Sequence, residues 1–273
     1  MSFVVNQEAK IYWDEQGQGA PVLLIMGLGY TSAMWYRTRP VLAQHFRTIA
    51  LDNRGVGLSD VPAGPYSIAT MASDAAAVLD AAGIAHAHVF GVSMGGMIAQ
   101  EFVLQYPART RSLILGCTAA GGPSAVRAES KVADVLMARG MTPEQAREAI
   151  LPFIYDAATP REKIEQDVAV RQPWLPTPAG YIAQLQAILA WESYSRIAQI
   201  TAPTLVIHGK SDALVPPGNG ELIAKRIPGA KLVLLDHASH LFLTDRTDEA
   251  HRVILEFLLS HAGREPNPET GRS

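Results

Sequence analysis

A serine stands between two glycines in the segment VFGVSMGGMIAQ, which spans residues 89–100. Gly91 and Gly95 lie two positions to either side of Ser93, where an apolar, strand-like run gives way to a helix-like pattern. A G-x-S-x-G sequence between a strand and a helix is typical of a nucleophile elbow, a sharp turn that exposes the serine hydroxyl. The glycines remove side chains that would collide in such a turn. The sequence therefore predicts Ser93 as a catalytic nucleophile.

A serine hydroxyl needs a base to accept its proton and an acid to orient that base. Asp212 follows the apolar run PTLVIHG, and His240 lies in the loop after the next such run, AKLVLLD. The carboxyl ends of parallel strands share one edge of a sheet, where open α/β sheets hold their sites. We therefore expect Ser93, Asp212 and His240 to form a catalytic triad with serine as nucleophile, acid as orienting group and histidine as base.

Other residues near these strand ends could take the same roles. His237 is the alternative base, but it directly follows its strand and is expected to pack or to face solvent. Asp236 is the alternative acid, but it lies in the loop of the base itself and comes late in chain order. Structural roles are expected for the remaining candidates, namely His208 and Cys117 as buried residues and Asp52 and Arg54 as braces of a neighbouring loop.

Acyl transfer passes through an oxyanion, which needs fixed N–H donors. The residue after the nucleophile, Met94, is expected to supply one donor through its backbone. The segment MGLG at 26–29 follows an apolar run, and its glycines let the backbone approach a substrate closely. We therefore expect the backbone N–H of Leu28 to supply the second donor.

Eight short runs indicate the strands that must position these residues. SFVVNQ and KIYWDE alternate as in a hairpin, and the others are continuous apolar runs suited to strands buried on both faces: PVLLIMG, FRTIALD, AHVFGVS, RSLILGC, PTLVIHG and AKLVLLD. Helical patterns separate most of them, near residues 67–82, 94–106, 219–227 and 247–261. This alternation predicts a doubly wound α/β sheet flanked by helices.

The connection between two of these strands, residues 118–203, is too long for a simple loop and carries helical patterns. We interpret residues 123–198 as an inserted helical cap on a core formed by 1–122 and 199–262. The polar segment 263–273 is rich in glycine and proline, and we expect a mobile tail there.

The composition narrows the function class. The chain has 273 residues, 48% of them hydrophobic, and a net charge of −3, which gives no electrostatic footprint for nucleic acid or an anionic membrane. One cysteine allows neither an internal disulfide nor a cysteine-based zinc site. The chain shows no secretion signal and no apolar run of about 20 residues, as a membrane helix needs. We expect a cytoplasmic protein without metal or cofactor; the oligomeric state stays open.

Five segments resemble those of α/β-hydrolase superfamily serine hydrolases in order and spacing: LIMGLG, LDNRGVGLSD, GVSMGGMIAQE, HGKSDALVP and HASHLF. Residues 54–120 are especially similar to 3-oxoadipate enol-lactonase-like hydrolases, and also to polyketide methyl ester esterases and cofactor-free haloperoxidases. The resemblance implies an α/β-hydrolase fold with a mostly parallel eight-stranded sheet and an inserted helical cap. One departure is Met26-Gly27, where enol-lactonases tend to carry a small polar pair.

These features together predict a serine hydrolase that cleaves a carboxylic ester or lactone through an acyl-enzyme. Carbon–carbon bond hydrolysis and perhydrolysis use the same triad and stay as alternatives, as does a ligand receptor that retains the triad. A dinucleotide-binding oxidoreductase fits less well, because GLGYTS carries Ser32 where that fingerprint needs its third glycine.

The cap is expected to roof the site and to set specificity. Its apolar candidates are Met137, Phe153, Tyr155, Trp174, Trp191 and Tyr194, for which packing within the cap is the alternative, and Trp35 follows the oxyanion loop. With Met26, Leu28 and Met94 near the nucleophile, we expect a largely apolar small-molecule substrate rather than a small lactone with a carboxylate. Four arginines of the cap could pair with a carboxylate but are expected at the surface: Arg127, Arg139, Arg171 and Arg196.

Overall fold

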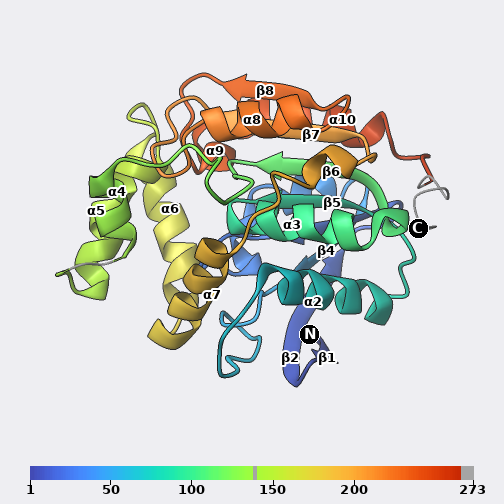
Figure 1. The fold of residues 1–273 in the computed structure, drawn as a ribbon, viewed down its shortest axis with the longest axis horizontal. Coiled ribbons are helices and arrows are strands. Elements are labelled where there is room, and N and C mark those ends of the chain that lie inside the picture. Colours follow the sequence, from blue (N-terminus) through green and yellow to red (C-terminus); the bar gives the residue numbers. More distant parts are fainter. Residues whose placement is uncertain (138–139, 266–273) are drawn as a thin grey trace.

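One sheet of eight strands forms the centre of the computed structural model, which describes residues 1–137 and 140–265 (Figure 1). Its strands lie in the order β1-β2-β4-β3-β5-β6-β7-β8. The pairs β1–β2 and β2–β4 are antiparallel, and all other neighbours are parallel. The strand bounds are β1 Ser2–Asn6, β2 Ala9–Gln16, β3 Pro21–Ile25, β4 Arg47–Leu51, β5 Ala87–Val92, β6 Thr110–Gly116, β7 Thr204–Gly209 and β8 Lys231–Leu235. The predicted mostly parallel sheet is confirmed.

Both faces of the sheet are covered, which explains the continuous apolar runs of its central strands. In β3, Leu23 and Ile25 belong to one buried cluster, and Val22 and Leu24 belong to another on the opposite face. The first cluster includes residues of α2 (Ile68–Ala81), α3 (Met94–Gln105) and α8 (Gly218–Arg226). The second includes residues of the short helices η1 (Ser32–Tyr36), α1 (Arg39–Leu42) and α9 (Phe242–Asp245) and of α10 (Thr247–Leu259).

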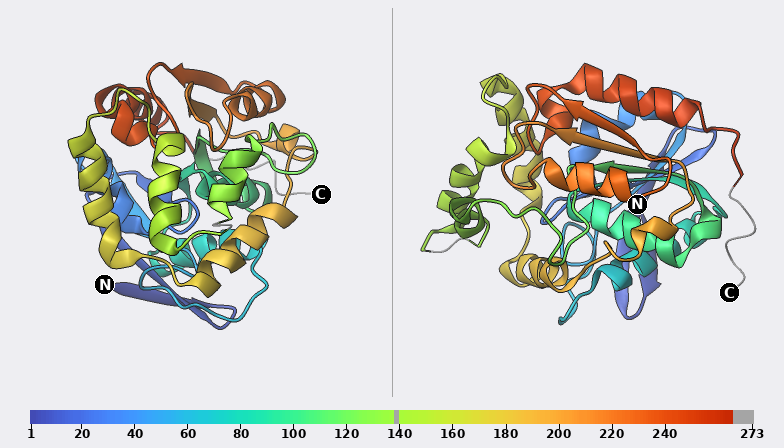
Figure 2. Two further views of the ribbon diagram at one scale, coloured as in Figure 1. Left: turned by 90° about the vertical axis from the view of Figure 1, so that its left-hand side faces the viewer. Right: turned by 45° about the horizontal axis from the view of Figure 1, so that its top comes forward.

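Between β6 and β7, the described residues form four α-helices, all in the region predicted as a cap, and two short 3-10 helices, Gln172–Trp174 and Ile197–Gln199. The bounds of the α-helices are α4 Ser130–Leu136, α5 Pro143–Ile154, α6 Arg161–Arg171 and α7 Pro178–Ala190. Threonine side chains begin two of them, because Thr142 and Thr177 accept hydrogen bonds from the first turns of α5 and α7. Figure 1 shows α4, α5 and α6 beyond the end of the sheet at which α3 begins, and Figure 2 shows the same helices from that side.

Helix α7 is tied to the loops that follow β3 and β4. The side chain of Gln184 is buried and donates to the carbonyl of Arg54 at 2.8 Å. Its Oε1 atom accepts the backbone N–H of Gly29 at 2.9 Å. Because one amide group bridges both loops, the inserted helices hold the loop that was predicted to supply an oxyanion donor.

The far end of the described chain lies against the sheet. Glu265 forms an ion pair with Arg111 at 3.0 Å, and its other carboxylate oxygen lies 3.0 Å from Nε2 of His86. The rest of the predicted tail, 266–273, lies outside the described residues. Within residues 1–137 and 140–265, no helix combines the length and the apolar character that crossing a membrane requires.

Candidate active site

Ser93 joins β5 to α3 in a strained conformation, with φ 56° and ψ −123°. Positive φ is unfavourable for a residue that has a Cβ atom, and the surrounding packing must enforce it. A Cβ atom at Gly91 would lie 2.1 Å from the carbonyl oxygen of Gly95, and one at Gly95 would lie 2.1 Å from that of Ile25. Neither position can hold a side chain, so the turn predicted from the G-x-S-x-G pattern is present and depends on both glycines.

Two further segments fix Ser93 in place. Its N–H donates to the carbonyl of Gly116 at 2.9 Å, and its carbonyl accepts the hydroxyl of Thr118 at 2.6 Å. A Cβ atom at Gly27 would lie 3.0 Å from Ser93 Cβ and 3.4 Å from its Oγ, so the loop after β3 lies close to the Ser93 side chain. Sequence reasoning did not single out Thr118, because nothing in its own segment marks this contact.

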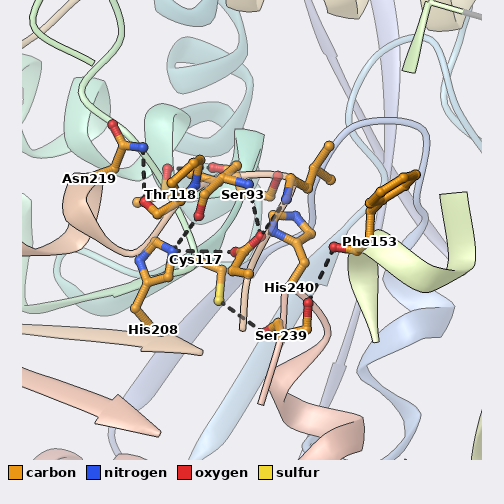
Figure 3. A network of polar contacts seen from close by, with 12 residues as sticks. Ser93, Cys117, Thr118, Phe153, His208, Asn219, Ser239 and His240 are labelled. Atoms are coloured by element: carbon orange, nitrogen blue, oxygen red, sulfur yellow. Dashed lines mark hydrogen bonds and ion pairs between the residues drawn. The ribbon is translucent and has the colours of Figure 1, made fainter. Parts of the chain in front are cut away.

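The predicted acid and base meet beyond β7 and β8. Nδ1 of His240 lies 2.8 Å from Oδ2 of Asp212, and both side chains are buried. The other oxygen of Asp212 accepts the N–H groups of Leu214 and Val215 at 3.0 and 2.8 Å. Figure 3 shows Ser93, Cys117, His208 and His240 gathered in one cluster. The fold thus brings together the loops that carry all three predicted triad residues.

Electrostatics keep the acid ionised. Burial by itself would raise the pKa of Asp212, but His240 and His208, both at hydrogen-bonding distance, lower it to about 2. The contact of His208 with this carboxylate was not expected from the sequence, which pointed to an ordinary buried histidine. The carboxylate of Asp212 therefore carries its negative charge throughout the neutral pH range.

The two predicted oxyanion donors have free backbone N–H groups. Met94 is the first residue of α3, where the N–H has no partner within the helix. Across the described ranges, the amides of Leu28 and Met94 donate to no protein acceptor. The Leu28 amide lies between Gly27, which touches Ser93, and Gly29, which is held by α7.

The alternative candidates lie apart from this cluster or are chemically unsuited. His237 is exposed at φ 53°, and Asp236 forms an exposed ion pair with Lys210 at 2.7 Å. Cys117 is fully buried, and burial together with nearby Asp212 raises the pKa of its thiol well above the ordinary value. A thiol held in its protonated form is a poor nucleophile, which leaves the hydroxyl of Ser93 as the better candidate.

The residues expected to brace a neighbouring loop are indeed tied into it. Asp52 accepts the N–H of Ser32 at 2.7 Å through one carboxylate oxygen and the N–H of Leu58 at 2.9 Å through the other. Arg54 forms two hydrogen bonds of 2.7 Å with the buried carboxylate of Asp74. These contacts give Asp52 and Arg54 structural roles, so neither side chain needs a catalytic role to account for its presence.

The apolar and aromatic residues singled out from the sequence differ in their burial and contacts. Trp191 donates its Nε1–H to Glu101 at 2.9 Å, and Trp35 packs against Phe90 in the core. Met137 is largely exposed, whereas Tyr155 is buried and donates to Asp167 at 3.0 Å. The other aromatic side chains lie near cations or at a helix end: Phe153 near Lys131, Tyr194 near Arg226 and Trp174 in the single turn Gln172–Trp174.

The four arginines of the predicted cap differ in their exposure and in their partners. Arg127 is exposed as expected, and Arg139 lies outside the described residues. Arg196 pairs with the buried carboxylate of Glu101 at 2.8 Å, and Arg171 is half-buried. Surface solvation therefore does not describe these last two residues, because each lies against the protein rather than in open water.

One group of side chains could in principle ligate a metal. Ligand atoms of Cys117, Asp212 and His240 lie within 4.8 Å of one another in the described structure. Asp212 and His240 already share a hydrogen bond. A metal ion bound by all three would compete with that bond, so the group can serve metal binding or proton transfer but not both.

Comparisons with known proteins show which family the chain resembles. The model of the family described as alpha/beta hydrolase fold matches residues 20–138 and 165–247. A putative carbamate hydrolase, RutD, from Azorhizobium caulinodans is 33% identical over 261 residues, which cover 94% of this chain and 98% of that protein. A poly(3-hydroxyalkanoate) depolymerase from Ectopseudomonas oleovorans is 34% identical over 259 residues, covering 92% of this chain and 89% of the depolymerase.

A solved structure shows the same likeness in three dimensions. The enol-lactonase from Burkholderia xenovorans LB400 matches with a TM-score of 0.85 at 27% identity, covering 94% of this chain and 100% of the lactonase chain. The resemblance inferred from the sequence motifs is confirmed. With the strand order and the family match over most of its length, the chain belongs to the α/β hydrolase fold family.

Proposed function

We propose that this protein is a serine hydrolase that cleaves a carboxylic ester or lactone through an acyl-enzyme. The observation that carries the proposal is the strained turn at Ser93 together with the buried Asp212–His240 pair in one cluster. The relatives support an acyl substrate, because they are named as a carbamate hydrolase, a poly(3-hydroxyalkanoate) depolymerase and an enol-lactonase.

Each group has a defined part in this reaction. Ser93 Oγ attacks the carbonyl carbon while Nε2 of His240 takes its proton, and the carbonyl oxygen becomes an oxyanion near the Leu28 and Met94 amides. This attack forms a tetrahedral intermediate. When the intermediate collapses, the bond between the carbonyl carbon and the alkoxy oxygen breaks, and His240 gives the proton to the departing alcohol. Water then attacks the acyl-enzyme, His240 takes a proton from it, and that proton returns to Ser93 as the acid leaves.

The ionised Asp212 orients this base. Its Oδ2 atom faces Nδ1 of His240 at 2.8 Å, so Nδ1 donates its proton there and Nε2 is left to accept one from Ser93. The carboxylate also stabilises the imidazolium that forms when the proton moves. The pKa of about 2 for the Asp212 carboxyl keeps this charge in place during turnover.

The part of the small-molecule substrate near the scissile bond is proposed to be apolar. Met26 is buried and Leu28 half-buried in the loop after β3, and Met94 is buried immediately after the nucleophile. Leu28 offers hydrophobic contact to the groups that flank the scissile bond, and the buried Met26 and Met94 bring no charge near them. Each methylene that the pocket accommodates is expected to improve transition-state binding by up to about 1 kcal/mol.

The proposal is tested with uncharged aryl esters and a fluorophosphonate probe. The wild-type protein should turn over the esters and be labelled on Ser93, and Ser93→Ala should lose both, with turnover falling by about four orders of magnitude or more. Ser195→Ala is the matched control, since Ser195 is exposed and its hydroxyl donates to Glu192 at 3.0 Å. More than about a tenth of wild-type turnover in Ser93→Ala would overturn the assignment. Labelling without turnover would favour the receptor alternative.

A further inference from the structure

A cavity lies between the loop after β3 and the inserted helices α5 and α6. On one wall, Tyr30 donates its N–H to the carbonyl of Gly27 at 3.2 Å, and Gly27 touches Ser93. On the other wall, the carbonyl of Ile154 accepts the N–H of Leu241 at 2.8 Å, one residue after the proposed base. These two hydrogen bonds tie the walls of the cavity to the loops that carry Gly27 and the proposed base.

Two arginines line this cavity with unused hydrogen-bonding capacity. Arg171 donates from Nη1 to the hydroxyl of Tyr30 at 3.0 Å, and its guanidinium lies 4.2 Å from the centre of that ring. Its Nε–H is excluded from solvent and has no hydrogen-bond partner in the described structure. Arg147 has a long contact of 3.4 Å with Gln172. A buried donor without a partner is costly, and a ligand oxygen would relieve that cost.

Neither of these arginines has an acidic partner within residues 1–137 and 140–265. Other arginines near the site do have one. Arg37, Arg54 and Arg196 each pair with a carboxylate whose side chain is at most 8% exposed. The absence of a carboxylate partner therefore distinguishes the two guanidinium groups of this cavity from arginines that only hold the fold together.

The one acid that lines the cavity is already engaged. Asp167 accepts the hydroxyls of Tyr36, Tyr155 and Thr244 at 2.5, 3.0 and 2.6 Å, and Arg37 pairs with it at 3.3 Å. Its charge is balanced by Arg37 rather than by the cavity arginines. The two arginines of the cavity consequently carry positive charges that no carboxylate of the described residues pairs with.

We infer that Arg171, assisted by Arg147, binds a carboxylate carried by the substrate at the end remote from the scissile bond. The inference rests on the proposed hydrolase function and extends it to the substrate class, an ester or lactone with an apolar middle and an acidic end. The interior of the cavity, about 10 Å³, has room for about one water-sized group, which suits a carboxylate oxygen rather than a ring. Guanidinium–carboxylate hydrogen bonds are among the strongest in proteins, particularly where water is excluded.

The test compares three aryl esters of one acyl length, ending in a methyl, a carboxamide or a carboxylate group. For the wild-type protein, kcat/KM should be highest for the carboxylate ester. Arg171→Gln should lower kcat/KM for that ester by about tenfold or more. For the aryl ester whose acyl chain ends in a methyl group, called the methyl-ended ester below, kcat/KM should stay within about twofold of the wild-type value. Arg147→Gln should act in the same direction with a smaller effect. Arg127→Gln, an exposed arginine of the same insertion, is the control and should change none of the three values.

Several results would overturn the subsite. If Arg171→Gln lowers kcat/KM equally for the methyl-ended and the carboxylate-ended esters, Arg171 has a structural role through Tyr30. Equal kcat/KM values for the carboxamide and carboxylate esters would show that the cavity selects a hydrogen-bond acceptor and not a charge. An unchanged preference in Arg171→Gln would show that the selectivity lies elsewhere.

Failure of the proposed function is separable from failure of the subsite. If the protein turns over the methyl-ended ester and this turnover depends on Ser93, the hydrolase proposal stands whether or not the protein prefers the carboxylate-ended ester. If no ester is turned over, isothermal titration of hexanoate and hexanamide decides the subsite on its own. Binding of hexanoate alone to the wild-type protein, lost in Arg171→Gln, supports it, and equal or absent binding of both overturns it.

Discussion

Nε2 of His208 lies 3.3 Å from the Asp212 oxygen that also accepts Nδ1 of His240 at 2.8 Å. The same Nε2 atom lies 2.8 Å from the carbonyl oxygen of Val215, which can only accept a hydrogen bond. Nε2 must therefore carry a proton, which it donates to Val215, and the same N–H lies close enough to Asp212 to stabilise the charge of this proposed triad acid. Its other nitrogen, Nδ1, is buried beside Gly220 without a hydrogen-bond partner in the described structure.

His208→Phe should impair catalysis because it removes this donor from a buried carboxylate. A lost hydrogen bond to a buried charged group costs about 1–3 kcal/mol, so kcat should fall by about tenfold or more, and the pKa of Asp212 should rise from its depressed value of about 2. His208→Gln can keep an N–H donor and should retain more activity. kcat measured against pH for both variants checks this. A loss of thermal stability with unchanged kcat in His208→Phe would reduce His208 to a packing role.

His240→Ala should abolish turnover, and His237→Ala should leave it nearly intact. Of these two histidines, His240 bonds Asp212, whereas His237 is exposed at the start of the same loop. We expect a loss of about four orders of magnitude or more for His240→Ala and less than about threefold for His237→Ala. Steady-state rates with an aryl ester give the answer. The reverse ranking would transfer the role of base to His237.

Gly27→Ala should slow acylation without unfolding the protein. The backbone of Gly27 does not need positive φ, but its new Cβ would lie 3.0 Å from Ser93 Cβ and 3.4 Å from Oγ. Crowding of the nucleophile should lower the fluorophosphonate labelling rate by about tenfold or more, because misplacement of reacting atoms is costly.

Gly83→Ala is the matched control, because Gly83 has a positive φ but no close neighbour, the reverse of Gly27. Gly83 has φ +67°, and a Cβ atom at this position would meet no other atom within 4 Å. The substitution should therefore cost about 1 kcal/mol of stability through backbone strain and leave labelling unchanged. Similar labelling rates for Gly27→Ala and the wild-type protein would mean that the loop moves away from Ser93.

Asp245 should make stability depend on pH. Burial raises the pKa of its carboxyl to about 6, although it accepts the hydroxyl of Thr159 at 2.6 Å and the N–H of Ser239 at 2.7 Å. The folded protein then binds more protons than the unfolded chain between about pH 4 and about pH 6, so the free energy of unfolding falls as pH rises through that window. Its contribution is fully present below about pH 4 and is lost above about pH 6.

The measurement is urea unfolding across this pH range for the wild-type protein and Asp245→Asn. The wild-type protein should lose on the order of 2–3 kcal/mol more than the variant between about pH 4 and pH 7. Asp248→Asn is the control, because Asp248 is exposed on the following helix, α10. Parallel pH profiles for the wild-type protein and Asp245→Asn would contradict the burial argument.

The elements of the core could be predicted from the sequence because their signals are local. Each central strand is a continuous apolar run, since both faces are buried, and the turn at Ser93 requires glycines at fixed spacing, since a Cβ there would collide with backbone. Asp212 and His240 were predictable for a related reason. Each follows a recognisable strand, and parallel strands bring their carboxyl ends to one edge.

The sequence by itself therefore determined the fold class, the succession of strands along the chain and the segments that meet at the site. Only the tertiary structure decided which side chains complete it. His208 reaches Asp212 from inside β7, Asp245 holds the loop of the base, and Arg171 meets Tyr30 across 141 residues of sequence. No local pattern encodes such contacts, because hydrogen bonds and ion pairs depend on distances that exist only after distant segments have packed together.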